Sequence, residues 1–145
     1  MYRRSTARVQ TVSDDLLKIT IKLPISYKNR NYVSSIFGGS MFSAVDPIPM
    51  VQLMNIIGDD YVVWDKSAEI YFKRPAREDL YAKFTFSIEE LEQIKRHVAE
   101  KKEIDFVKVT QLTNADQSIV YCEVKKTIYV AEKLHYKEKL KSRKV

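Results

Sequence analysis

Residues 37–58 read FGGSMFSAVDPIPMVQLMNIIG and are apolar for most of their length. One carboxylate, Asp46, interrupts the stretch, and Pro47 and Pro49 follow it closely. Because proline has no backbone N–H, each proline leaves the carbonyl four residues earlier without its helical partner. We therefore predict one long buried helix that loosens or kinks around Asp46 and gives this side chain a polar niche. A carboxylate and two prolines depart from the residue preferences of a buried helix, and several such departures at one place indicate a functional site.

The start of this predicted helix carries a second signal. Gly38 and Gly39 allow a ligand to approach the backbone closely, and the free N–H groups of a helix N-terminus attract negative charge. A membrane span is one alternative, because the length suffices, but Asp46, Gln52, Asn55 and the two prolines argue against it. A central helix wrapped by a sheet explains the hydrophobicity better. Asp46 is then either part of a hydrolytic site or a satisfied structural carboxylate.

The composition describes one globular domain of 145 residues, of which 30% are charged and 45% hydrophobic. The single cysteine, Cys122, excludes an internal disulfide. It alternates with Val120 and Val124, so we expect it to pack in a strand. Residues 1–10 are basic and polar and do not resemble a signal peptide. These features predict a cytoplasmic protein.

Most of the net charge of +6 lies at the two ends of the chain. Residues 1–8 contain Arg3, Arg4 and Arg8, and residues 133–145 contain six basic side chains. A nucleic-acid-binding domain would be expected to carry its basic stripe on a folded face. We therefore predict a core of about residues 14–132 with solvated basic tails and no nucleic-acid partner. Contact of the tails with the phosphates of a nucleotide-bearing ligand, or with an anionic membrane surface, is the alternative.

Alternating and helical patterns predict the remaining elements. Residues 17–23, 61–74 and 80–86 alternate as strands, and Ser87 with Glu90 forms a capping box that opens a short amphipathic helix. Residues 103–112 and 118–132 form a predicted hairpin. The predicted order is strand, long buried helix, strand, strand, short helix, strand, strand.

That order resembles the hotdog fold, an α+β architecture in which an antiparallel sheet wraps around one long buried helix. Hotdog thioesterases of the phenylacetate-pathway type carry an asparagine, then His-Gly-Gly, then an aspartate seven residues after the second glycine. This chain has Asn31, then Phe37-Gly38-Gly39, then Asp46 at that spacing. The segment YFKRPAREDLYAKF (71–84) is similar to the strand-turn-strand signature of the same superfamily. The combination is most similar to a bacterial branch of hotdog domains of unknown function.

The resemblance implies an acyl-CoA thioesterase that works as a homodimer or homotetramer, with one site shared between two subunits. The backbone N–H of Gly39 would polarise the thioester carbonyl, with Gly38 and Phe37 beside the substrate. Asp46 of the partner subunit would act as general base or nucleophile, and Asn31 would orient water or the carbonyl. No metal and no separate cofactor are expected, because coenzyme A enters as part of the substrate.

Further side chains are assigned by the same resemblance. Ser67 would hydrogen-bond Asp46, and Lys73, Arg74 and Arg77 would pair with coenzyme A phosphates. Each assignment has a plainer alternative. Asn31 can simply close a turn, Ser67 can be an ordinary strand hydroxyl, and the three cations can be solvated.

One departure leaves the activity open. Phe37 stands where the resembling enzymes have histidine, and phenylalanine cannot donate a hydrogen bond. A non-catalytic module that binds acyl thioesters is therefore the second hypothesis. A hydroxyacyl-thioester dehydratase is the third and least favoured, because it needs a histidine paired with an acid and neither His97 nor His135 is placed for that role.

Overall fold

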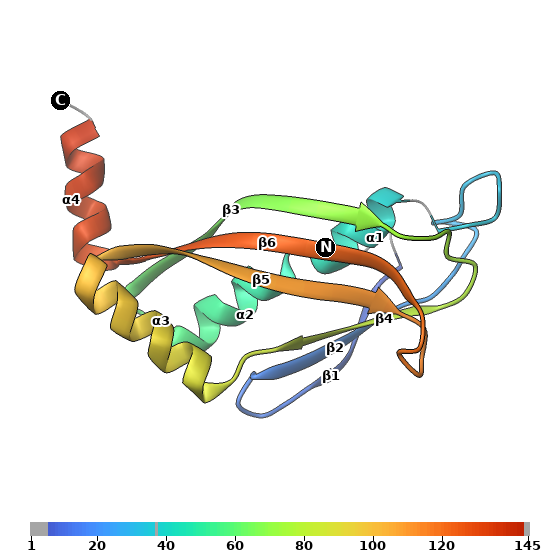
Figure 1. Ribbon diagram of the computed structural model, residues 1–145, viewed down its shortest axis with the longest axis horizontal. Coiled ribbons are helices and arrows are strands. Elements are labelled where there is room, and N and C mark those ends of the chain that lie inside the picture. The colour runs from blue at the N-terminus through green and yellow to red at the C-terminus, as the bar shows by residue number, and fades with distance from the viewer. Residues whose placement is uncertain (1–5, 37, 144–145) are drawn as a thin grey trace.

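The described strands form one antiparallel sheet that a pair of consecutive helices crosses (Figure 1). The structure is a computed structural model that describes residues 6–36 and 38–143, so Phe37, Arg3 and Arg4 lie outside the described residues. The elements in chain order are β1 (Arg8–Val12), β2 (Lys18–Leu23), α1 (Gly38–Val45), α2 (Ile48–Ile57), β3 (Tyr61–Phe72), β4 (Leu80–Thr85), α3 (Ile88–Lys101), β5 (Glu103–Thr113), β6 (Val120–Glu132) and α4 (Lys133–Arg143). The strand order in the sheet is β1-β2-β4-β5-β6-β3, which leaves β3 at one edge of the described sheet.

Two consecutive helices, α1 and α2, replace the single long helix that the sequence predicts. Asp46 still donates its N–H to the Phe42 carbonyl at 2.8 Å, but Pro47 and Pro49 have no N–H to donate one turn back. The chain therefore turns between the helices, and the predicted kink at Asp46 is confirmed as a break. No helix in the described part of the chain is long and apolar enough to cross a membrane.

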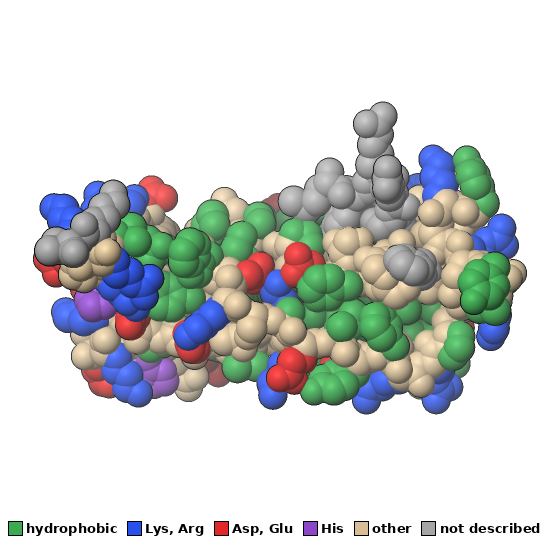
Figure 2. Space-filling model, turned by 90° about the horizontal axis from the view of Figure 1, so that it is seen from above, with side chains coloured by type: hydrophobic (Ala, Val, Ile, Leu, Met, Phe, Trp, Pro, Cys, Tyr) green, Lys and Arg blue, Asp and Glu red, His purple; other side chains and the backbone are tan. Residues whose placement is uncertain are grey.

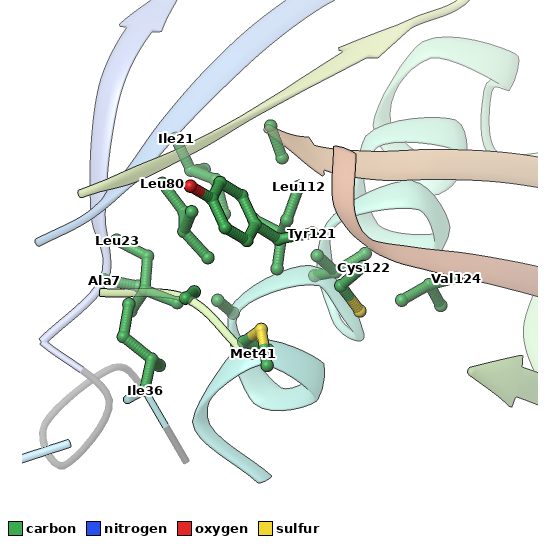
Figure 3. Close-up of a cluster of buried hydrophobic side chains, with 14 of the residues drawn as sticks. Ala7, Ile21, Leu23, Ile36, Met41, Leu80, Leu112, Tyr121, Cys122 and Val124 are labelled. Carbon is green, nitrogen blue, oxygen red and sulfur yellow. The ribbon is translucent and has the colours of Figure 1, made fainter. Parts of the chain in front are cut away.

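The two helices cover neighbouring hydrophobic clusters on the same face of the sheet. The first cluster includes Met41 of α1 with Cys122 and Val124 of β6 (Figure 3). The second includes Leu53 of α2 and Ile128 of β6. Burial raises the pKa of the Cys122 thiol to about 11. This residue is therefore a neutral packing thiol near neutral pH, as its position in the alternation predicts.

The other predicted elements are confirmed with small shifts at their ends. α3 begins at the predicted capping box, in which the Glu90 N–H donates to Ser87 Oγ at 3.0 Å and the Ser87 N–H donates to Glu90 Oε1 at 3.2 Å. β1 is not predicted by the sequence. Its residues, RVQTV, do not alternate between polar and apolar, and all five side chains are exposed. The folded core therefore begins earlier than residue 14.

The C-terminal residues form a docked helix, α4, and the prediction of a solvated basic tail is wrong for this end of the chain. Tyr136 packs edge-on against Trp64 of β3, with ring centroids 5.6 Å apart, and its centroid lies 6.1 Å from that of Tyr129 of β6. Lys139 Nζ lies 2.8 Å from Glu103 Oε2. The many lysines of this segment predict a solvated tail, but the single aromatic residue among them, Tyr136, packs the helix against the sheet.

The anchor of α4 on Glu103 should make folding stability sensitive to acid. Lys139 and Tyr129 donate hydrogen bonds to the carboxylate and lower the pKa of Glu103 to about 2, from an ordinary 4.5. Because the folded-state pKa is the lower one, this stabilisation is present above about pH 4.5 and is lost as the pH falls through about 2. We expect Glu103→Gln to lower the melting temperature at neutral pH and to weaken its fall in acid. Thermal unfolding across this pH range measures both effects, with Glu100→Gln on the exposed side of α3 as the control. An acid profile equal to that of the wild type would contradict this expectation.

Candidate functional site

Asp46 forms an ion pair with a lysine from near the other end of the chain. Nζ of Lys126, on β6, donates a hydrogen bond to Oδ1 of Asp46 and lies 3.1 Å from Oδ2 of Asp65. The Lys126 side chain is 3% exposed, whereas the side chains of Asp46 and Asp65 are 41% and 28% exposed. The ammonium group is therefore enclosed, while both carboxylates reach solvent.

The register of the sheet explains how these three side chains meet. Lys126 lies on the helix-facing side of β6, between Val124 of the first cluster and Ile128 of the second. Asp65 pairs with Ile128 across the β3–β6 ladder, which places it on the same face as Lys126. Asp46 lies where α1 ends and α2 has not yet begun. A charged seam therefore runs between the two hydrophobic clusters.

Two carboxylate oxygens of this seam are left without a protein partner among the described residues. They are Oδ2 of Asp46, which accepts no hydrogen bond from the described residues, and Oδ1 of Asp65, which is buried. Phe42 covers the ammonium from the helix side, with its ring centroid 6.0 Å from Lys126 Nζ. A carboxylate with one oxygen held and the other reaching solvent can accept a proton from water.

The two glycines lie at the opposite end of α1. Gly38 opens the helix, and a Cβ built on it would lie 2.9 Å from Cζ of Phe72, so the chain passes close to the end of β3 here. Gly39 is exposed, and its N–H belongs to the first helical turn, which has no acceptor within the helix. This end of α1 can therefore receive an anionic oxygen.

The basic turn after β3 lies beside these glycines. The Ile36 N–H donates to the Ala76 carbonyl at 2.8 Å, which ties the turn to the segment that leads into α1. Lys73, Arg74 and Arg77 are all exposed around this tie, and Lys73 Nζ lies 3.6 Å from Glu123 Oε2. The structure thus brings the predicted phosphate-binding cations next to the predicted anion site.

Asn31 organises the loop in front of the glycines. Its Oδ1 accepts hydrogen bonds from the N–H groups of Val33 and Ser35, at 3.1 and 3.2 Å, and from the Ser35 hydroxyl at 3.1 Å. Its own N–H donates to the Ser35 carbonyl at 2.8 Å. The side-chain oxygen therefore closes a turn, which is the plainer of the two predicted roles.

Ser67 lies on the wrong face of the sheet to reach Asp46 within one chain. It pairs with Thr127, the residue after Lys126, and successive strand residues point to opposite faces. A bulge between Asp65 and Ser67 shifts the alternation at this point. Lys126 therefore occupies the position beside Asp46 that we assign to Ser67 from the sequence.

Within one chain, the candidate site is split into two halves. Gly39 lies in the first turn of α1 and Asp46 directly follows the helix, seven residues later, so about 10 Å along the helix axis separate them. One thioester carbonyl cannot contact both groups of the same chain. A site that uses both residues therefore needs the glycine half of one chain and the acid half of another.

The histidines lie away from this seam. His97 is exposed on α3, and His135 Nε2 of α4 lies 3.5 Å from Glu103 Oε2. Glu103 pairs with Ala131 on the face of the sheet opposite to Lys126, so this histidine–acid pair does not face Asp46. Among residues 6–36 and 38–143, no group of three or more histidine, cysteine or acidic side chains could hold a metal ion.

Lys126 and Asp65 belong to the charged seam but are not predicted as site residues from the sequence. One signal was available for the lysine. It occupies the position in the β6 alternation at which Cys122, Val124 and Ile128 predict another apolar residue. Asp65 carries no comparable signal, because the bulge after it interrupts the alternation of β3.

Comparison with known proteins places the chain in a family and a fold. The sequence matches the model of a domain of unknown function, DUF4442, over residues 3–130. A protein of unknown function from Pseudomonas aeruginosa, named a "probable thioesterase", has a similar structure, with a TM-score of 0.76 and 20% identity over 90% of this chain and 85% of that chain. A protein of unknown function from Chlorobaculum tepidum gives a TM-score of 0.71 with 14% identity, over 90% and 85% of the two chains. A thioesterase from Haemophilus influenzae gives 0.60 with 11% identity, over 89% and 80%. No curated protein matches the chain.

Structures this distant in sequence establish the fold and not the reaction. The architecture they share is the one that the sequence motifs predict, with a helical segment packed on an antiparallel sheet. The family match spans all elements from β1 to most of β6. The chain therefore belongs to the DUF4442 family and has the hotdog fold of the thioesterases.

Proposed function

We propose that this protein hydrolyses acyl thioesters, with acyl-coenzyme A esters as the substrate class, and that it acts as a homo-oligomer. The observation that carries the proposal is the carboxylate of Asp46, which Lys126 holds by one oxygen at the break between α1 and α2. Its other oxygen remains available at a side chain that is 41% exposed. The thioesterase names among proteins of the same fold support this class of reaction.

In the proposed mechanism, the N–H of Gly39 in one subunit polarises the thioester carbonyl and stabilises the negative charge that develops on its oxygen. Asp46 of the partner subunit removes a proton from water while the water oxygen bonds to the carbonyl carbon. The C–S bond then breaks, the acyl group leaves as a carboxylic acid, and the thiolate takes up the proton. Direct attack by the Asp46 carboxylate on the carbonyl carbon is the alternative first step.

The remaining site residues serve binding in this proposal. Lys73, Arg74 and Arg77 attract the phosphates of coenzyme A, because they are exposed beside the glycine end of α1. Asn31 shapes the loop that leads to the glycines. Coenzyme A belongs to the substrate, and no other cofactor is proposed. We place the protein in the cytoplasm, since its single cysteine is a buried free thiol.

A hydrolysis assay across acyl chain lengths tests the proposal. Purified protein is incubated with coenzyme A esters from acetyl to long-chain acyl, and the released thiol is measured with a chromogenic thiol reagent. We expect catalysed release from at least one class of ester. The absence of release from every ester would reject the hydrolase.

A binding module without catalysis is the second candidate, and the phenylalanine at position 37 favours it. A chain of this kind would bind a non-hydrolysable thioether analogue of acyl-coenzyme A and would release no thiol from the matching ester. Calorimetric titration of the analogue, carried out beside the hydrolysis assay, separates the two candidates.

The proposed site predicts that the protein is at least a dimer in solution. The side of the molecule seen in Figure 2 carries several hydrophobic side chains. Exposed hydrophobic residues of β3 and of α2, which contacts β3, include Trp64 (51% exposed) and Met54 (44% exposed). An open edge strand is also ready to pair with another strand.

We expect light scattering at micromolar concentration to give a mass of two chains or more. Met54→Asp should lower this mass to one chain. Val107→Asp, at a site 46% exposed on β5, should leave at least a dimer. A single-chain mass for the wild type would exclude the shared site.

A further inference from the structure

Lys126 is an unusual residue for its position. Its side chain lies on the helix-facing side of β6, between two hydrophobic clusters, and only 3% of it is exposed. Enclosing an ammonium group is costly, and a well-packed apolar side chain is often at least as stabilising at such a place. The alternation of β6 also calls for an apolar residue there. A lysine at this place therefore needs partners that compensate for its burial.

The contacts of Lys126 point toward Asp46. Nζ donates to Oδ1 of Asp46, which comes from the helix break, and lies near Oδ2 of Asp65, which comes from the edge strand β3. Asp46 lies directly after α1 and before Pro47, at the break between the two helices. A bond to an enclosed ammonium limits rotation of this carboxylate and leaves Oδ2 as the oxygen that can meet water.

We propose that Lys126 is a positioning residue for thioester hydrolysis, which orients the carboxylate of Asp46, and that Asp65 in turn holds Lys126. This inference rests on the proposed function. The ammonium does not touch the substrate. It holds one oxygen of the Asp46 carboxylate in place. Its positive charge offsets the negative charge of one of the two carboxylates in the seam. The proposal also accounts for the lysine itself, because an apolar residue at position 126 would leave both carboxylates without the cation that they share.

Replacing Lys126 with methionine tests this role, because methionine keeps much of the length of the side chain and loses the charge. We expect Lys126→Met to lower kcat about 10- to 100-fold, since a small misplacement of a catalytic group has effects of this order. KM should change little, because Lys126 does not contact the substrate in this proposal. Lys126→Arg should recover part of the lost kcat. The matched control is Lys125→Met, at the preceding residue of β6, whose exposed side chain points to the opposite face of the sheet.

A chemical rescue separates positioning from a structural role. Lys126→Ala leaves space at the seam, and added propylammonium should restore part of kcat, whereas neutral propanol should not. Asp65→Asn should lower kcat less than Lys126→Met does, because it removes only the second support. These variants also serve if Lys126→Met does not fold.

The outcomes distinguish this inference from the proposed function. A folded Lys126→Met protein with the kcat of the wild type, or a Lys126→Ala protein that propylammonium does not rescue, would overturn the positioning role while leaving the hydrolase in place. A wild-type protein without thiol release from any ester would reject the hydrolase, and the positioning role with it. Loss of kcat in Lys126→Met together with recovery in Lys126→Arg and by propylammonium would support both.

Discussion

Asp46→Asn is expected to lower the rate of thioester hydrolysis about 10²- to 10⁴-fold, the usual contribution of general acid–base catalysis. The amide keeps the shape of the carboxylate and can no longer take a proton from water. Folding, oligomeric mass and binding of a non-hydrolysable acyl-coenzyme A analogue should be preserved. The measurement is thiol release under saturating substrate, with the analogue titrated by calorimetry.

The protein offers a matched control for this substitution. Asp105 of β5 also pairs with a lysine, since Lys66 Nζ lies 2.8 Å from its Oδ2, but this pair is exposed. Asp105 is paired with Tyr129 of β6, on the face of the sheet opposite to Lys126. Asp105→Asn should therefore leave hydrolysis unchanged. Hydrolysis at the wild-type rate by folded Asp46→Asn protein would refute the mechanism. A loss of stability without any effect on turnover would instead make Asp46 a structural carboxylate.

Removal of residues 133–145 is expected to lower the melting temperature by about 5–10 °C. The truncation removes two aromatic contacts of Tyr136, with Trp64 and Tyr129, each worth about 0.5–1.5 kcal/mol. It also removes the pair between Lys139 and Glu103, which is half-exposed and therefore adds at most about 1 kcal/mol. A loss of about 2–3 kcal/mol shifts the melting temperature of a domain of this size by roughly the stated amount.

Two point variants show whether the stability comes from the packing of Tyr136 or from the positive charge of α4. Tyr136→Ala should account for most of the loss, whereas Lys141→Ala, at an exposed position of the same helix, should leave the melting temperature within about 1 °C of the wild type. Calorimetric or circular-dichroism melts at neutral pH give the comparison. A truncated protein as stable as the full chain would show that this end is solvated, as the charge pattern alone predicts.

Features that depend on residues within one helical turn of each other are predicted reliably from the sequence. The break at Asp46 follows from the chemistry of Pro47 and Pro49, because a missing N–H acts on a carbonyl only one turn away. The capping box at Ser87 is equally local. Both were predicted, and both are found.

Long-range partners were not predictable in the same way. The carboxylate of Asp46 is held by Lys126, which is 80 residues further along the chain, and not by Ser67. The choice depends on the register of β6 against β3 and on one bulge, which together decide the face to which each side chain points. In α4, the contact of Tyr136 with Trp64 likewise links residues far apart in sequence, while the lysines around it suggested a solvated tail.

The resemblance of its motifs predicts the hotdog fold, and local patterns in the sequence predict the order of the core elements and the helix break at Asp46. These local patterns are alternation, caps and proline chemistry, which act over a few residues. The long-range contacts depend on the tertiary structure, which brings Lys126 and Asp65 to Asp46 and docks Tyr136 of α4 on Trp64. Strand register and helix length set these contacts, and neither can be read from neighbouring residues alone.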